Sequence, residues 1–269
     1  LERLEEMGEL DNTLVVVSGD HGIPGFPRGK CNLYDLGCEV ALAARWPGRI
    51  PDGRLVEDCV NLMDLAPTFL EAAGVEAPEG MCACSLLDVL ESPEEGQVDP
   101  ERTAVVTGRE RHVGAAREGN LPYPQRAMRT RDFLYIRNFA PDRWPMGDPR
   151  GLDDPQAEPP DFDALCSDTF VAYPDMDAGP TKAWMIHHRG EEQVRRLFEI
   201  GFGKFPAEEL YDLREDPHYM NNVVAEPAYE ETRRQLAERL MAVLKEQNDP
   251  RVAEEDCRFE RSPFTDVGD

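Results

Sequence analysis

The chain has 269 residues, of which 41% are hydrophobic, and this length and content suffice for one or two folded cores. Its formal net charge of −25 disfavours nucleic acids as partners, because a phosphate backbone requires a basic surface. No apolar run comes near the roughly 18 residues that cross a bilayer, so we expect no membrane partner either. The oligomeric state is left open.

The first predicted elements lead to an acid and an imidazole. Apolar residues recur at helical spacing at the start of the chain, which predicts the end of a helix over Leu1–Gly8. The apolar run Leu14–Val17 is too short for a helix and too continuous for a half-exposed strand, which indicates a fully buried parallel strand. Asp20 and His21 follow its carboxyl end, where ligands bind in open α/β sheets. This position suggests that the two residues take part in ligand binding or catalysis.

The side chains that follow the strand suit a metal ion or an anion. Asp20 offers a hard oxygen ligand for calcium or magnesium, and His21 offers a ligand nitrogen or a donor to a developing anion. Glycines and prolines over residues 22–29 predict a shaped loop that delivers Arg28 and Lys30. A divalent cation beside two fixed positive side chains can hold a tetrahedral oxyanion such as sulfate or phosphate. The alternative is a plain turn with solvated cations.

Another helix and a linker are expected next along the chain. Asp64 is a candidate N-cap and Gly74 a stop signal for a helix that buries Leu65 and Phe69. Ser, Pro, Glu and Gly then dominate Glu91–Pro100, which is typical of a linker and predicts a domain boundary.

The remaining predicted elements form a smaller α+β arrangement. Pro227 opens an amphipathic helix that ends near Asn248 and should pack on a small antiparallel sheet. The strands of that sheet are predicted at Thr103–Thr107, Gln125–Thr130 and Phe133–Asn138.

The order of these pieces resembles the type I, formylglycine-dependent sulfatases. The matching pieces are Asp20–Gly22, Gly29–Lys30, Leu33–Tyr34, Arg45–Pro51 and Val60–Thr68. A second group resembles the heparan N-sulfatase, or sulfamidase-like, branch and comprises Gly108–His112, Pro122–Pro124, Arg129–Thr130, Leu134–Asn138 and Pro206–Leu213.

The resemblance implies an α/β, alkaline-phosphatase-like sulfatase fold. Residues 1–96 are then the C-terminal part of the catalytic domain, in which helices sandwich a mixed, mainly parallel sheet. Residues 97–269 are the C-terminal α+β subdomain with its antiparallel sheet and long helix. It also implies a periplasmic or secreted location.

The resemblance further implies roles for individual residues. Asp20 stands as a ligand of one active-site calcium ion, and His21 lies beside that ion in a metal and catalytic role. Lys30 stands where a catalytic basic residue contacts the sulfate group. A satisfied core or surface histidine is the alternative for His112. The residues expected to bind the substrate are Arg28, Lys30, Arg109, Glu110 and His112.

The acidic chain would repel a sulfated polysaccharide at long range. Such a substrate therefore needs a locally positive pocket, since the lining of a cleft governs its field more than the total charge does. The candidates for that lining are Arg28, Lys30, Arg109 and Arg111.

One departure from the sulfatase pattern concerns the nucleophile. Sulfatases form formylglycine from a cysteine in a Cys-x-Pro/Ala-x-Arg motif, and none of the seven cysteines here lies in one. The N-terminal aspartates that complete the calcium site are also absent. We therefore expect the C-terminal part of a longer sulfatase, with formylglycine in the missing segment and no activity in the isolated chain.

The predicted function is hydrolysis of sulfuric esters or sulfamates of sulfated carbohydrates. Two alternatives stay open: a phosphodiesterase or phosphonate hydrolase of the alkaline phosphatase superfamily, and a catalytically inactive, sulfatase-derived glycan-binding module. Arg45–Pro51 and Glu110–Tyr135 favour the sulfatase over the phosphatases.

Overall fold

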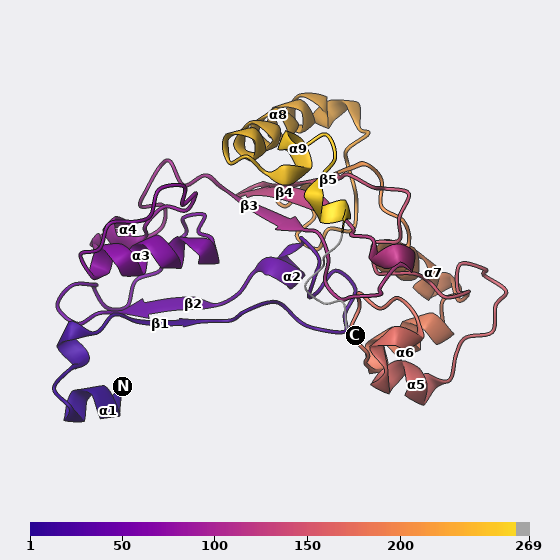
Figure 1. Cartoon of the computed structure of the whole chain (residues 1–269), viewed down its shortest axis with the longest axis horizontal. Helices are drawn as coiled ribbons and strands as arrows, with labels where there is room; N and C mark the ends of the chain where they lie inside the picture. The colour runs from indigo at the N-terminus through magenta and orange to yellow at the C-terminus, as the bar shows by residue number, and fades with distance from the viewer. Residues whose placement is uncertain (262–269) are drawn as a thin grey trace. The chain divides into compact units, whose positions relative to one another are not determined.

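The computed structural model describes residues 1–261, and its chain divides into two compact units. The first comprises Leu1–Asp20 and Val40–Val105; the second comprises His21–Glu39 and the chain from Val106 onward. Each unit is considered by itself below, with the element labels of Figure 1. None of the described helices combines the length and apolar character that a membrane crossing requires.

The first unit is built from short helices and one antiparallel pair of strands. Its strands pair antiparallel, with Val15 opposite Arg45 and Ser18 opposite Leu42. The elements are α1 (Glu2–Glu6), β1 (Val15–Ser18), β2 (Leu42–Arg45), α3 (Leu65–Ala72) and α4 (Leu87–Glu91), with 3₁₀ turns at Leu10–Asn12 and Leu62–Asp64.

The expectation of a fully buried parallel strand at Leu14–Val17 is wrong for the described chain. Within residues 1–261, β1 pairs with β2 alone and runs antiparallel to it. Val17 is 66% exposed, because a strand is buried on both faces only where further elements cover it. The apolar residues of a strand do not by themselves show whether other elements cover both of its faces.

The helix after Asp64 is confirmed, but its cap and its buried face differ from the prediction. Asp64 does not cap α3 with its side chain. Its carboxylate instead accepts from the backbone N–H of Asn61 at 3.1 Å and from Arg102 at 2.9 Å. Phe69 is 46% exposed, whereas Thr68 is fully buried and accepts a hydrogen bond from the segment that leads into α4. The helix turns a different face inward from the expected one.

The segment Glu91–Pro100 is held firmly rather than free, contrary to the linker prediction. The buried carboxylate of Asp58 accepts hydrogen bonds from the backbone N–H groups of Val98 at 2.8 Å and Asp99 at 2.6 Å. The compact unit continues to Val105, while the predicted domain division at residues 96 and 97 stays a prediction.

A four-stranded sheet in the order β3-β4-β5-β6 belongs to the second unit, apart from the first two residues of β3. The strands are β3 (Ala104–Arg109), β4 (Gln125–Thr130), β5 (Phe133–Asn138) and β6 (Glu208–Asp212). β5 runs antiparallel to both β4 and β6. The predicted second and third strands are confirmed with their bounds, and β6 is an addition to the predicted sheet.

Helices complete the second unit: α2 (Asp35–Cys38), α5 (Phe162–Ser167), α6 (Pro180–His187), α7 (Glu192–Phe202), α8 (Glu230–Glu246) and α9 (Pro250–Ala253). As predicted, α8 packs on the sheet, where it lies against β4 and β5 (Figure 1). Leu236, Leu240 and Leu244 recur every four residues and are all buried, which gives the helix its apolar stripe. A separate hydrophobic core joins α5, α6 and α7 to the segment around Tyr173.

Replacing Leu240 with alanine should lower the free energy of unfolding by about 2–5 kcal/mol, because the side chain is fully buried and its loss leaves a cavity. Urea denaturation followed by circular dichroism measures the change. Leu197→Ala, at an exposed position of α7, is the matched control and should change the free energy of unfolding by about 0.5 kcal/mol or less. Equal losses in both variants would refute the assigned packing of α8.

Candidate functional site

The loop that carries Lys30 is folded back on itself by close backbone contacts. The N–H of Gly22 donates to the carbonyl of Gly37 at 2.9 Å, and that of Lys30 donates to the carbonyl of Ile23, also at 2.9 Å. A Cβ atom at Gly29 would lie 2.3 Å from the Ile23 carbonyl oxygen, so only glycine fits there. The predicted shaped loop is confirmed, and it fixes the backbone of Lys30.

Lys30 ends in a partly accessible ion pair. Its Nζ lies 3.1 Å from Oδ2 of Asp177, and the two side chains are 29% and 28% exposed. An ammonium and a carboxylate of the second unit thus lie side by side, and both remain partly accessible to solvent. Each keeps capacity for a further hydrogen bond, because Nζ has three N–H donors and the carboxylate has several acceptor sites.

A buried carboxylate lies two residues before Asp177. Oδ2 of Asp175 accepts from Nη2 of Arg109 at 3.0 Å and from Nη2 of Arg117 at 2.5 Å. Oδ1 accepts from the backbone N–H of Val113 at 3.3 Å. Burial alone would raise the pKa of Asp175, but the two guanidinium groups outweigh it and hold that pKa below its ordinary value. Asp175 is therefore ionised in the folded protein.

His112 lies beside this carboxylate. Its Nδ1 is 3.9 Å from Oδ1 of Asp175 and makes no hydrogen bond within residues 1–261. Burial lowers the pKa of His112, and although Asp175 and Asp177 act to raise it, the net shift is downward. A neutral imidazole, 17% exposed, thus stands next to the Lys30–Asp177 pair at neutral pH.

We call this group the Asp175 cluster, and it consists of Lys30, Arg109, His112, Arg117, Asp175 and Asp177. The structure therefore brings three sequence-predicted residues together, namely Lys30, Arg109 and His112. Arg109 lies in the buried part, where it holds Asp175 and also donates to the carbonyls of Cys31 and Pro145.

The sequence prediction missed the acidic half of the cluster. Arg117, Asp175 and Asp177 were not singled out. Two aspartates at alternate positions, in the run Tyr-Pro-Asp-Met-Asp, were the available signal. Paired carboxylates in a loop are a recognisable pattern for binding polar ligands.

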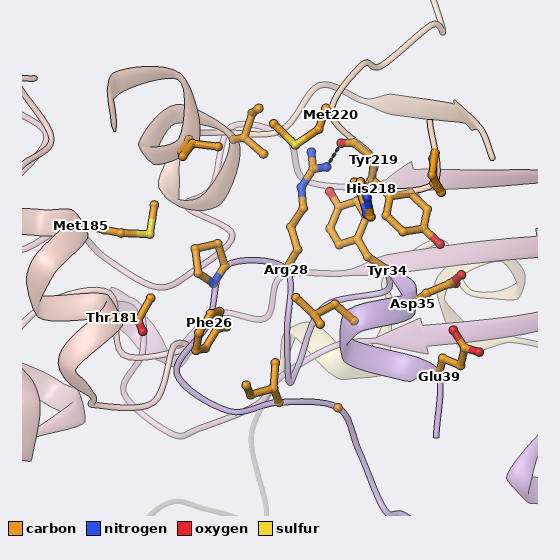
Figure 2. Close-up of a pocket in the computed structure, with 17 residues that line it drawn as sticks. Phe26, Arg28, Tyr34, Asp35, Glu39, Thr181, Met185, His218, Tyr219 and Met220 are labelled. Carbon is orange, nitrogen blue, oxygen red and sulfur yellow. Dashed lines mark hydrogen bonds between the residues drawn. The ribbon is translucent and has the colours of Figure 1, made fainter. Parts of the chain in front are cut away.

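Arg28 is placed in an aromatic cluster rather than beside Lys30. Its guanidinium carbon lies 4.3 Å from the centre of the Tyr34 ring, and its Nη2 donates to the hydroxyl of Tyr211 at 2.9 Å. Nη1 donates to the carbonyl of Tyr219, the dashed bond in Figure 2. This end of Arg28 lines a mostly apolar cavity of about 690 Å³, together with Phe26 and Met185 among others.

Glu110 is engaged by two arginines. It forms ion pairs with Arg126 at 2.8 Å and with Arg251, and Arg126 also binds Asp249 at 2.6 Å. These contacts tie the segment after α8 to the sheet. The predicted contact of Glu110 with a sugar stays a prediction, and it would require one of these ion pairs to open.

Asp20 and His21 are exposed residues at the division between the units: Asp20 ends the first part of one, and His21 begins the other. Nδ1 of His21 donates to the carbonyl of Gly22 at 2.7 Å. Calcium takes six to eight oxygen ligands. Over residues 1–261, no three His, Cys, Asp or Glu side chains converge in a way that could hold a metal ion. These residues alone therefore do not fit a complete calcium site, and the calcium assignment stays a prediction.

Comparison with known proteins finds similar sequences. Residues 20–105 match the family model described as N-sulphoglucosamine sulphohydrolase, C-terminal. An ulvan-active sulfatase of Formosa agariphila is 27% identical over 239 residues, which cover 89% of this chain and 39% of that protein. N-sulphoglucosamine sulphohydrolase of Homo sapiens is 28% identical over 266 residues, covering 95% and 46% respectively. The chain thus spans less than half the length of these relatives.

Solved structures show the same fold. One, determined in complex with its substrate D-glucosamine-2-N,6-O-disulfate, gives a TM-score of 0.62 at 23% identity and covers 95% of this chain and 39% of that one. The phosphonate monoester hydrolase of Agrobacterium radiobacter gives 0.56 at 19% identity, covering 91% and 38%. The predicted α/β, alkaline-phosphatase-like sulfatase fold is confirmed for the C-terminal region. Residues 20–105 are thus similar to the C-terminal region of the N-sulphoglucosamine sulphohydrolases, and the chain is similar to sulfatases over part of their length.

Proposed function

We propose that this chain supplies substrate-binding residues to a hydrolase of sulfuric esters or sulfamates in sulfated carbohydrates. The observation that carries the proposal is the accessible Lys30–Asp177 pair, 3.1 Å apart, at the edge of the Asp175 cluster. The relatives named above, which are sulfatases, support the same direction.

The pair suits a sulfated sugar because such a ligand has two kinds of polar group. The sulfo group carries a negative charge that the ammonium of Lys30 can bind through its N–H donors. The sugar hydroxyls need acceptors, and the exposed part of the Asp177 carboxylate provides them. His112, neutral at pH 7, adds a nitrogen that can accept or donate without adding charge.

The buried members of the cluster serve the accessible ones in this proposal. Arg109 and Arg117 fix Asp175 from two sides. Oδ1 of Asp175 in turn lies 3.9 Å from Nδ1 of His112, so the carboxylate beside the imidazole is one that cannot move far. Three fixed cations against two carboxylates leave this group locally positive despite the acidic chain, as an anionic ligand requires.

The proposal assigns no turnover to the isolated chain. Its seven cysteines lie outside any formylglycine motif, and binding groups without a nucleophile leave little rate enhancement. Formylglycine and one calcium ion, with Asp20 and His21 among its neighbours, are proposed for the complete enzyme.

Isothermal titration calorimetry with D-glucosamine N-sulfate tests the binding step. The chain should bind the sulfated sugar, bind unsulfated glucosamine at least about tenfold more weakly, and lose about tenfold in affinity with Lys30→Met, since a charge-assisted hydrogen bond is lost. Lys245→Met, at an exposed position of α8, is the matched control and should bind as the wild type does. Equal affinity for both sugars, or an unchanged Lys30→Met variant, contradicts the proposal.

Two further measurements separate the alternatives. Release of nitrophenol from 4-nitrophenyl sulfate by the isolated chain would contradict its proposed inactivity, and tighter binding of phenylphosphonate than of the sulfated sugar would favour the phosphonate hydrolase. The coding sequence before residue 1 distinguishes a hydrolase from a binding module. An in-frame Cys-x-Pro/Ser/Ala-x-Arg motif there supports the hydrolase, whereas a start codon at residue 1 supports the module.

A further inference from the structure

A buried lysine lies beneath the segment that carries the two carboxylates. Lys182 belongs to α6 and is 0% exposed. Its ammonium donates to three backbone carbonyls, those of Thr169 at 3.1 Å, Tyr173 at 3.2 Å and Met176 at 2.8 Å. An ammonium has three N–H donors, so these three carbonyls use all of them.

The three carbonyls belong to one short stretch, residues 169–177, which begins with the 3₁₀ turn Thr169–Val171. Asp175 and Asp177, the carboxylates of the Asp175 cluster, lie at its end. Within the stretch Tyr173 has a φ of 46°, a left-handed conformation that is uncommon for a residue other than glycine. Such a conformation persists where surrounding contacts impose it. The ammonium of Lys182 supplies one of those contacts directly, at the Tyr173 carbonyl.

Lys182 occupies a position that disfavours a lysine unless its ammonium has partners. A positive charge in the first turn of α6 opposes the helix dipole, and burial of an ammonium is unfavourable unless it is paired or hydrogen-bonded, a need that the three carbonyls of residues 169–177 meet. Burial lowers the pKa of Lys182 to about 8, although Asp177 and Asp168 act to raise it. Arg150 lowers it further.

We propose that Lys182 is a positioning residue for the candidate site: its ammonium fixes residues 169–177 so that Asp175 meets His112 and Asp177 meets Lys30. The positioning of residues 169–177 by Lys182 is inferred from the hydrogen bonds alone. The effect on ligand binding rests on the proposed function above, and separate measurements test the positioning and the effect on binding.

The pKa of His112 reports the position of the carboxylates without any ligand. Asp175 and Asp177 raise this pKa, while Lys30 and Arg109 lower it. If Lys182→Met releases the segment, the carboxylates move away and the pKa of His112 should fall by about 0.5 or more. Lys182→Arg keeps a charged donor that can still reach some of the carbonyls, so we expect a smaller fall. NMR titration of the imidazole signals, with His112→Asn to assign the resonance, measures both variants.

Far-UV circular dichroism is the control, because it shows whether the helices of each variant, α6 among them, remain folded. A fall at His112 with an unchanged spectrum supports the proposal, and no change at His112 overturns it. Where Lys182→Met also alters the spectrum, the Lys182→Arg variant decides by the same two outcomes.

Calorimetry with D-glucosamine N-sulfate tests the consequence for binding. Lys182→Met should weaken the affinity about tenfold, since a displaced carboxylate and imidazole no longer fit the ligand. A shifted His112 pKa with unchanged affinity overturns the link to the ligand. Absence of binding by the wild-type chain defeats the proposed function, while the His112 titration still decides whether Lys182 positions the segment.

Discussion

Asp175→Asn is expected to lower the free energy of unfolding by about 3–5 kcal/mol, a large fraction of a typical domain's stability. The substitution keeps the size of the side chain but removes its charge. Arg109 and Arg117 would then be buried cations without a counter-ion, since both donate to Oδ2 of Asp175. Urea denaturation at pH 7, followed by circular dichroism, measures the loss.

Asp177→Asn is the matched control for this change. It removes the same charge two residues along the chain, but from the partly exposed pair with Lys30. Water screens such pairs, so the free energy of unfolding should change by about 1 kcal/mol or less. Comparable losses in the two variants would contradict the buried role assigned to Asp175.

The pH dependence of stability follows from the same carboxylate. The pKa of Asp175 is lower in the folded chain than in the unfolded one, so the unfolded chain takes up a proton first as the pH falls. The contribution of Asp175 is therefore complete above the ordinary aspartate pKa and is lost as the pH falls through the lower, folded value. Asp175→Asn should show a flatter acid limb of stability against pH than the wild type.

Elements governed by local periodicity were predictable from the sequence. β4, β5 and α8 occur where alternation and the four-residue leucine spacing place them. β1 was predicted as a strand but not with its exposure, since burial of a strand depends on its neighbours and its own residues do not specify them. The held segment Glu91–Pro100 was missed for the same reason: its anchor, Asp58, lies more than 30 residues away.

Part of the candidate site was predictable, whereas its two carboxylates and Arg117 were not. Lys30 and His112 stand out because basic groups after a glycine-rich loop, or in a matching motif, suggest an oxyanion site. Asp177 joins Lys30 from 147 residues further along, and Asp175 joins His112 from a separate part of the chain, pairings that only the folded chain defines. Lys182 was hidden for a related reason, because its partners are backbone carbonyls, which every residue has.

Arg28→Lys is expected to lower the free energy of unfolding by about 3 kcal/mol, because the guanidinium anchors the Lys30 loop to the sheet of the second unit. It lies over the ring of Tyr34 and donates to Tyr211 and Tyr219, contacts that a lysine ammonium cannot reproduce together. Arg28 also has a φ of 59°, a conformation that needs such contacts to persist. Urea denaturation measures the change, with Arg234→Lys at an exposed position of α8 as a control that should leave the midpoint unchanged.

The same variant decides between two roles for Arg28. If Arg28 contacts the sulfate group directly, as the sequence suggested, Arg28→Lys should weaken binding of D-glucosamine N-sulfate and leave the free energy of unfolding unchanged. If Arg28 is an anchor, the substitution should lower the free energy of unfolding, and it should weaken binding only as far as the Lys30 loop becomes mobile. The hydrogen bonds of the guanidinium to Tyr211 and Tyr219 already use both of its Nη atoms and favour the anchor. Lowered affinity at unchanged stability is the result that would restore the direct contact.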